Sequence, residues 1–252
     1  MSKTVFVTGA ASGIGQSIAE RFAKEGHTVI VSDLNIAGAK EVCDHLTSEG
    51  YTAEPYQLDV SSAEAIERVG KDYPNIDILV NNAGIQHVAK IEEFPADRWA
   101  LLTNILLVGP AMLTRAVMPG MKERNYGRII NIGSIHGLIA SPYKSAYVAA
   151  KHGLIGFSKV IALETGEHDI TINTICPSYV KTPLVEKQIA ATAEEHGISE
   201  EEVVNNIMLA PMPKKAFISL EELAETALFL MSPAARNITA QTMVLDGGWV
   251  AR

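Results

Sequence analysis

The feature that most constrains the fold of this chain is a short apolar strand that runs directly into a glycine-rich turn. Residues 3–8, KTVFVT, have the composition of a buried strand, and GAASGIG follows with Gly9, Gly13 and Gly15. Apolar residues at helical spacing come next and stop at Gly26. This order suits the pyrophosphate of a dinucleotide, because glycine lets the backbone approach closely and the helix N-terminus offers unpaired N–H groups to an anion. The spacing is GxxxGxG rather than GxGxxG, and such a cluster can also be a simple tight turn.

The next strand pattern indicates which dinucleotide the turn would bind. HTVIVSD ends on Asp33, the position of a βαβ unit where an acidic side chain binds the ribose hydroxyls of adenosine. A carboxylate there would repel the extra phosphate of NADP, and neither Leu34 nor Asn35 supplies a compensating positive charge. The sequence therefore favours NAD. The alternative is that Asp33 caps the following helix.

Apolar strand patterns alternate with helical patterns along the whole chain. The alternation predicts a doubly wound (Rossmann) parallel α/β sheet of about seven strands with helices on both faces. The expected strands lie near residues 3–8, 28–33, 52–57, 76–80, 127–132, 170–175 and 241–245.

The length and the 47% hydrophobic content are compatible with a single domain over residues 1–252. Residues 182–217, which carry prolines and a charged helical run, are the exception to this compactness and predict a helical insertion. Two capping boxes are expected to start helices, one formed by Ser199 with Glu202 and one by Ser219 with Glu222.

Bulk properties exclude several classes of protein. A formal charge of −8 disfavours binding to nucleic acid. Apolar stretches such as ILLVGPAMLT are short and interrupted, and no signal-peptide pattern opens the chain, so we expect no membrane contact and a cytoplasmic location. Cys43 and Cys176 are too few for a disulfide framework, and the histidines form no zinc-ligand pair, so we expect no metal.

Tyr147 and Lys151, in the run YVAAK, are candidates for acid–base chemistry. A free tyrosine has a pKa near 10, so about 0.1% is phenolate at neutral pH, and a nearby positive charge would make it a better base. Positions four apart lie on one face of a helix, so the phenol and the ammonium can converge. Taken alone, the pair can equally be a half-buried aromatic beside a solvated amine.

Several separately placed motifs together resemble the short-chain dehydrogenase/reductase family over essentially all 252 residues. They are TGAASGIG, NNAG at residues 81–84, Asn104, Ser134 and YVAAK. A closer likeness, to D-3-hydroxybutyrate dehydrogenases, lies in NNAGIQHVAKIEEFP, GRIINIGSIHGLIASPYKSAYVAAKHG and TPLVEKQI.

The resemblance implies a role for each member of a catalytic set. Tyr147 would take the alcohol proton while hydride leaves to the nicotinamide, and Ser134 would hold the substrate oxygen. Lys151 would bind the nicotinamide ribose and lower the pKa of Tyr147 towards 7, which needs roughly 4 kcal/mol. Asn104 would hold a water that links Lys151 to solvent.

The implied cofactor site draws on strand ends across the chain. Asn82, Ala83 and Gly84 would close the groove, and Asp59 with Val60 would meet the adenine. The full set is Gly9, Ser12, Gly13, Ile14, Gly15, Asp33, Asp59, Val60, Asn82, Ala83, Gly84, Tyr147, Lys151, Pro177, Val180 and Thr182. The insertion at residues 182–217 resembles the substrate lid of the family.

The subfamily likeness implies a small-molecule substrate with a carboxylate, which needs hydrogen bonds and a positive partner. Gln86, His136, Lys144 and Gln188 match the positions that bind this carboxylate in hydroxybutyrate dehydrogenases, although each alone can be a loop or surface side chain. The implied substrate site is Gln86, Ser134, His136, Lys144, Tyr147 and Gln188.

The expected activity is the reversible, NAD-dependent oxidation of (R)-3-hydroxybutyrate to acetoacetate. The alternatives are a 3-oxoacyl thioester reductase, a dehydrogenase of another small secondary alcohol, and a cofactor-binding regulator without turnover. Lys144 discriminates among the enzymes, because a thioester would not need a cation there. The complete catalytic set disfavours the regulator.

Two further features concern selectivity and assembly. CPSYVKTP has Ser178 and Tyr179 where the family usually has glycine and an aromatic residue, often tryptophan in this subfamily. Ser178 should stiffen the loop, and Tyr179 could widen or polarise the pocket, which puts tight selectivity for the four-carbon acid in doubt. The C-terminal LDGGWVAR resembles the segment through which family members associate, so we expect a homotetramer.

Overall fold

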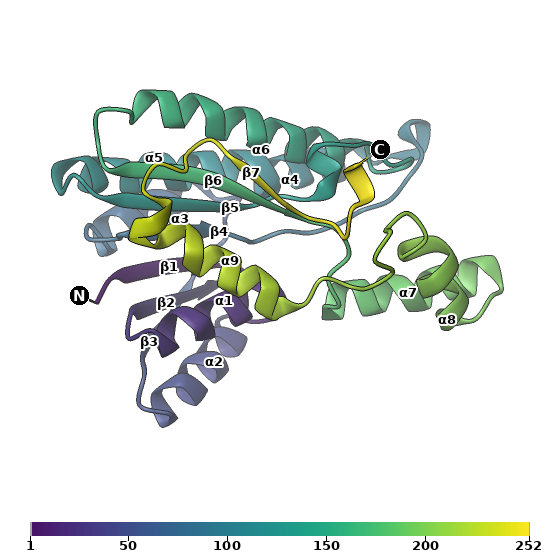
Figure 1. Ribbon diagram of the computed structural model, residues 1–252, viewed down its shortest axis with the longest axis horizontal. Coiled ribbons are helices and arrows are strands. Elements are labelled where there is room, and N and C mark those ends of the chain that lie inside the picture. Colours follow the sequence, from purple (N-terminus) through teal and green to yellow (C-terminus); the bar gives the residue numbers. More distant parts are fainter. Residues whose placement is uncertain (1, 252) are drawn as a thin grey trace.

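The computed structural model describes residues 2–251, and within them the strands form one parallel sheet in the order β3-β2-β1-β4-β5-β6-β7 (Figure 1). The order reverses between β1 and β4, and in such sheets ligands bind in the crevice at the carboxyl ends of the strands. The strands are β1 (Thr4–Thr8), β2 (Thr28–Asp33), β3 (Thr52–Gln57), β4 (Ile78–Asn81), β5 (Gly127–Ile132), β6 (Ile170–Pro177) and β7 (Thr242–Leu245).

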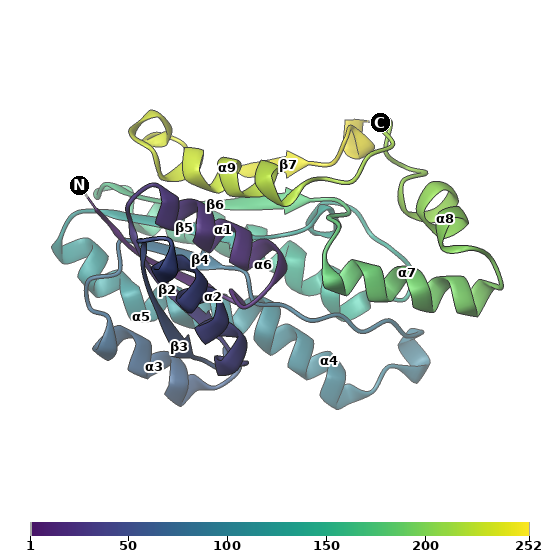
Figure 2. The same cartoon turned by 90° about the horizontal axis from the view of Figure 1, so that it is seen from below.

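Helices cover both faces of the sheet (Figures 1 and 2). They are α1 (Gly13–Lys24), α2 (Ile36–Ser48), α3 (Ala63–Asp72), α4 (Ala96–Thr103), α5 (Gly109–Glu123), α6 (Ser145–Glu164), α7 (Pro183–His196), α8 (Glu200–Glu202) and α9 (Leu220–Met231). The predicted fold class is confirmed. Each expected strand matches an observed one to within about two residues, because parallel strands buried on both faces leave continuous apolar runs in the sequence.

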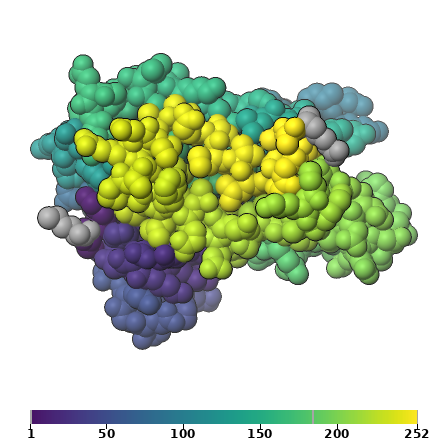
Figure 3. Space-filling model, viewed as in Figure 1, coloured from purple at the N-terminus to yellow at the C-terminus, as the bar shows by residue number. Residues whose placement is uncertain are grey.

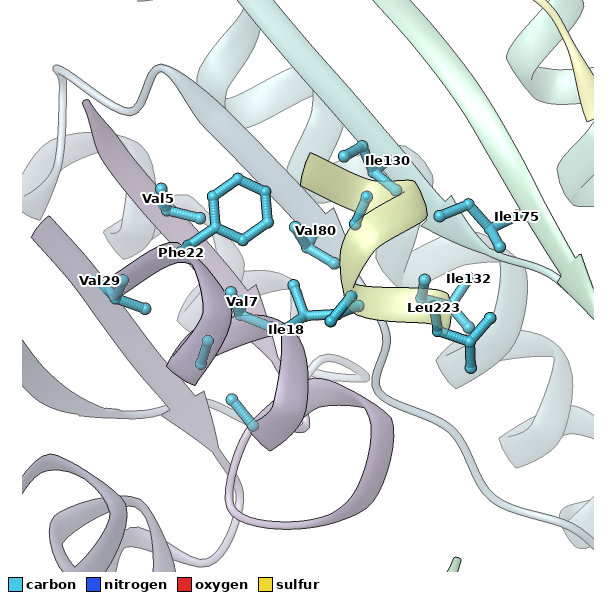
Figure 4. Packing of buried hydrophobic residues seen from close by; sticks show 14 of the residues in the cluster. Val5, Val7, Ile18, Phe22, Val29, Val80, Ile130, Ile132, Ile175 and Leu223 are labelled. Carbon is cyan, nitrogen blue, oxygen red and sulfur yellow. The ribbon is translucent and has the colours of Figure 1, made fainter. Parts of the chain in front are cut away.

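Alternate side chains along the strands pack into two separate cores, one on each face of the sheet. Val5 and Val7 of β1 pack against α1, α2 and α9, as Figure 4 shows for part of this cluster, whereas Phe6 packs with α3, α5 and α6 on the other face. The strand period of two produces this division. Pro55 interrupts neither core, since β3 is an edge strand and proline is tolerated where an N–H need not be donated to a neighbour.

The expected interruption within ILLVGPAMLT is wrong. The helix continues from α4 into α5 through a π-helical turn, Asn104–Val108, whose Asn104 carbonyl accepts the Gly109 N–H. Pro110 is tolerated there because it sits in the first turn of α5. By length and composition alone the whole stretch, Ala96–Glu123, could cross a membrane. Its side chains at Leu102 and Leu113 are buried in the cores, and 39% of its most apolar window is buried inside the structure.

Residues 182–217 form a helical insertion at one end of the molecule, beyond the carboxyl ends of the strands (Figures 1 and 2). It contains α7, α8 and a second π-helical turn, Val203–Met208, around a small core of its own that includes Ile189. Both predicted capping boxes are confirmed, with reciprocal side-chain and backbone bonds at the start of α8 and of α9.

Candidate active site

Two adjoining cavities open at the carboxyl ends of the strands. The larger, of about 500 Å³, runs along the glycine turn and the ends of β2 and β4; we call it the long cavity. The smaller, of about 300 Å³, lies beneath the helical insertion; we call it the short cavity. Ser134, Tyr147, Ser178 and Val185 line both cavities, so the two meet at the expected reaction centre.

The glycine turn brings backbone close to backbone. Gly9 has a left-handed φ of 64°, and a Cβ added there would lie 2.8 Å from the Ala83 Cα. Asn82, directly after β4, holds the same turn, because its side-chain amide donates to the carbonyls of Thr8 and Gly9 at 2.9 and 3.0 Å. The Thr8 hydroxyl in return accepts the N–H groups of Asn82 and Ala83, each at 3.0 Å. Thr8 is absent from the sequence-based site, although it stands within the TGAASGIG motif.

Gly15 does not line the long cavity, in contrast to the other expected cofactor residues. It is buried in α1, where a Cβ would collide with the carbonyl oxygen of Gly9. Its role is therefore to let α1 pack closely on the turn. The expected residues that do line the long cavity are Gly9, Ser12, Gly13, Ile14, Asp33, Asp59, Val60, Asn82, Ala83, Gly84, Tyr147, Lys151, Pro177, Val180 and Thr182.

The start of α1 has the free donors that a pyrophosphate needs. Ser12 is the N-cap residue, yet its side chain makes no capping hydrogen bond. The first N–H groups of a helix lack intrahelical partners, and here they open onto the long cavity beside Ser12, Gly13 and Ile14. The residues present thus fit a bound dinucleotide.

Asp33 lies where β2 ends and lines the long cavity. One of its carboxylate oxygens accepts the Ala11 N–H of the glycine turn at 3.0 Å, and the other accepts the Asn35 N–H at 2.9 Å. The alternative role as a helix cap is wrong, because Asn35 is the N-cap residue of α2 and its side chain accepts the Gly38 N–H.

Tyr147 and Lys151 lie one turn apart on α6, and Ser134 follows the end of β5. The Ser134 hydroxyl lies in hydrogen-bonding reach of the phenol and favours its ionised form. The buried ammonium of Lys151 donates to the Ile132 carbonyl at 2.6 Å and lies 5.7 Å from the centre of the Tyr147 ring. The structure therefore brings these three side chains together where the cavities meet.

The expected lowering of the pKa of Tyr147 by Lys151 is not found. Burial raises the pKa of Tyr147 above its ordinary value, and the hydrogen bond from Ser134 opposes this only in part. The same burial lowers the pKa of Lys151 to about 8. The physical reason is desolvation, which penalises the phenolate and the ammonium together.

Asn104 does not line either cavity. It belongs to the π-helical turn between α4 and α5, and its side chain is exposed. Its neighbours Ile105 and Leu106 line the long cavity instead. The water link from Lys151 to solvent therefore stays a prediction.

Gln86, His136, Lys144 and Gln188 converge on the short cavity from four separate segments. Lys144 is 7% exposed, burial lowers its pKa, and none of the ion pairs formed by residues 2–251 includes it. Burial, reinforced by the charge of Lys144, lowers the pKa of His136 to about 4, so the imidazole is neutral at pH 7. Its Nδ1 atom is buried without a hydrogen-bond partner among the described residues. A buried cation beside unused polar groups suits a small anion.

Two aromatic residues complete the wall of the short cavity. Tyr179 stacks on Trp249 with ring centres 6.0 Å apart and an interplanar angle of 25°, and the ring centres of Trp249 and His136 lie 6.1 Å apart in an edge-on arrangement. The sequence points to Tyr179 in this pocket but not to Trp249, which stands in the segment expected to mediate association. No spacing pattern could reveal it, because the fold brings residue 249 to side chains more than 60 positions away.

Comparisons with known proteins agree with this geometry. Residues 3–193 match the family model described as short chain dehydrogenase. The chain is 45% identical to a D-beta-hydroxybutyrate dehydrogenase of Cupriavidus necator, covering 99% of this chain and 98% of the relative, and 44% identical to one of Rhizobium meliloti over the full length of both. The solved structure of an actinorhodin polyketide ketoreductase with NADPH superposes with a TM-score of 0.93 at 33% identity, covering 98% of this chain and 97% of that one. The chain therefore belongs to the short-chain dehydrogenase family.

Proposed function

We propose that this enzyme oxidises (R)-3-hydroxybutyrate to acetoacetate, reversibly, with NAD as hydride acceptor. One observation carries the proposal: Lys144, His136 and Gln86 line the same cavity as Ser134 and Tyr147. A 3-hydroxy acid has a carboxylate two carbons from its hydroxyl-bearing carbon, so one small cavity must hold an anion site and a proton acceptor. The two relatives named D-beta-hydroxybutyrate dehydrogenase add support.

The side chains at the meeting point of the two cavities would each have a separate role in the reaction. Ser134 donates a hydrogen bond that orients the substrate hydroxyl, and the phenolate of Tyr147 removes its proton. NAD, when bound in the long cavity, would supply the acceptor for the hydride that leaves the hydroxyl-bearing carbon of the substrate. Lys144 and neutral His136 bind the carboxylate. Because burial raises the pKa of Tyr147, oxidation should accelerate with rising pH, whereas the protonated phenol is ready to donate during reduction near neutral pH.

The preference for NAD rests on Asp33. Asp33 and its neighbour Leu34, which is 64% exposed and uncharged, both line the long cavity. A 2′-phosphate placed there would meet a negative charge, and Lys151 on α6 is the single lysine or arginine among the described residues that line this cavity. This repulsion disfavours NADP.

A second candidate is a reductase of 3-oxoacyl thioesters. The high structural similarity to a polyketide ketoreductase favours it, as does the raised pKa of Tyr147, which suits proton donation. Lys144 argues against it, since a thioester carries no charge at that position and would leave the buried ammonium unpaired.

We further propose a single catalytic domain over residues 1–252, with 182–217 as a substrate lid, located in the cytoplasm and assembled as a homotetramer. Thr182, Val185 and Gln188 of the insertion line the cavities, which supports a lid. Exposed Phe229 on α9 and Val244 on the edge strand β7 offer an apolar surface for another subunit. Light scattering that shows a monomer at micromolar concentration would count against the tetramer.

A panel of turnover assays tests the activity. We expect oxidation of 3-hydroxybutyrate with NAD to exceed, by at least about tenfold in kcat/KM, both the reaction with NADP and the reduction of an acetoacetyl thioester. A higher kcat/KM for the thioester would establish the second candidate. Absence of turnover with all substrates, despite measurable binding of NAD, would refute an enzymatic role.

A further inference from the structure

Asp246 fixes the backbone on both sides of Trp249. It follows β7 directly and is 8% exposed. One carboxylate oxygen accepts the Gly248 N–H at 2.8 Å, and the other accepts the Val250 N–H at 2.8 Å. Hydrogen bonds to an ionised acceptor are about twice as strong as neutral ones. A single side chain therefore binds the backbone N–H groups of the residues on either side of Trp249, and the Asp246 backbone carbonyl accepts the N–H of Trp249 itself at 3.3 Å.

The turn that Asp246 holds is packed against the end of the helical insertion. Gly247 and Gly248 are both left-handed, with φ of 61° and 91°. The Gly247 carbonyl accepts the Lys214 N–H at 3.1 Å, and a Cβ on Gly247 would lie 3.1 Å from the Met212 Cε. Figure 3 shows the C-terminal segment, in yellow, lying against this green part of the chain. The turn has little room to shift as a whole.

Trp249 links the Asp246 turn to the wall of the short cavity. Its ring stacks on Tyr179 and meets the His136 ring edge-on, so it supports two of the side chains that line the cavity. His136 has no hydrogen bond at Nδ1 to fix its ring from that side. Aromatic contacts of this kind prefer particular offsets and angles, and a displaced indole would release both neighbours.

We propose that Asp246 is a positioning residue for substrate recognition, which it serves by fixing Trp249 against His136 and Tyr179. The inference rests on the proposed function for the identity of the substrate. Asp246 lines neither the long nor the short cavity, so it would act only through the indole.

A double-mutant cycle separates this role from general stabilisation. Asp246→Ala should raise the KM for 3-hydroxybutyrate about tenfold, within the range that interacting neighbours show, while kcat changes by less than about threefold. Trp249→Ala should raise KM to a similar extent, and adding Asp246→Ala to it should have no further effect on KM. If the two effects on KM multiply instead, Asp246 does not act through Trp249 and the proposal falls.

Asp77→Ala is the matched control. Asp77 also accepts a backbone N–H, that of Thr4 at 3.1 Å, but it lies at the amino ends of the strands, away from both cavities. This variant should lower Tm without raising KM. A rise in KM equal to that of Asp246→Ala would mean that any loss of stability moves KM, and would overturn the positioning role. Asp246→Asn keeps one acceptor oxygen and should give an intermediate KM, which also keeps the test open if Asp246→Ala does not fold.

Tryptophan fluorescence tests the placement without any substrate. The chain has two tryptophans, so Trp99→Phe leaves Trp249 as the single emitter. In that background Asp246→Asn should shift the emission to longer wavelength as water reaches the indole, and Asp77→Ala should not. An unchanged emission maximum refutes the inference. Failure of the wild-type enzyme to oxidise 3-hydroxybutyrate would refute the proposed function instead, and the fluorescence result would stand.

Discussion

Replacing Lys144 by methionine tests whether the short cavity recognises a carboxylate. Methionine keeps most of the length of the side chain and removes the ammonium. Burial lowers the pKa of Lys144, and the ion pairs among residues 2–251 do not include it. An unpaired buried charge costs folding free energy. We therefore expect the Tm of Lys144→Met to equal or exceed that of the wild type at pH 7.

The loss of substrate binding can be estimated from the surroundings of the ammonium. Removing one side of a desolvated charge pair typically costs about 2 to 5 kcal/mol. Exposed Val88 and Lys187 also line the short cavity, so water reaches it and the lower end of the range applies. About 2 kcal/mol corresponds to a fall of about thirtyfold in kcat/KM for 3-hydroxybutyrate.

The assay follows NADH absorbance with 3-hydroxybutyrate and with 2-butanol, which has the same reacting group but no carboxylate. The Lys144→Met penalty should nearly vanish for 2-butanol. Lys187→Met, the exposed lysine of the same cavity, should change kcat/KM less than about threefold with either substrate. In the wild type, KM for the acid should also rise with alkaline pH, because Lys144 loses its charge earlier than an ordinary lysine. Equal losses for the charged and the neutral substrate would refute carboxylate recognition.

Four further changes test other parts of the site. Tyr147→Phe should abolish measurable oxidation while NAD still binds by fluorescence titration, and activity within tenfold of the wild type would refute the base. Ser134→Ala removes a hydrogen bond that lowers the pKa of Tyr147 in the free enzyme, so the rising limb of log kcat/KM against pH should move to higher pH. Asp33→Ala should lower the ratio of kcat/KM for NAD over NADP by about tenfold or more, and an unchanged ratio would exclude Asp33 from the ribose site. Gly15→Ala should cost about 1 to 3 kcal/mol and lower Tm by several degrees, because its Cβ would collide with a backbone carbonyl. Gly156→Ala, where a Cβ meets nothing within 4 Å, is its control and should not lower Tm.

The architecture and the cofactor turn could be predicted from the sequence because their signals are local. A strand buried on both faces leaves a continuous apolar run, and a capping box leaves two polar residues three apart, as at Ser199 and Ser219. The left-handed backbone at position 9 likewise favours glycine, which is visible in the sequence. Parallel strands carry their carboxyl ends to one edge of the sheet, so motifs at those ends were expected to meet.

What only the tertiary structure decided depends on burial and on contacts between distant segments. The direction in which the pKa of Tyr147 shifts is set by how much water the fold removes from the phenol, and the distance to Lys151 along the helix does not contain that information. From the sequence, either Asp33 or Asn35 could cap the helix that follows β2. In the structure Asn35 is the N-cap residue of α2. Trp249 reaches the short cavity because β7 completes the sheet beside β6 and the Asp246 turn folds back over the strand ends. No local pattern encodes such an approach, since it arises from the packing of the whole sheet.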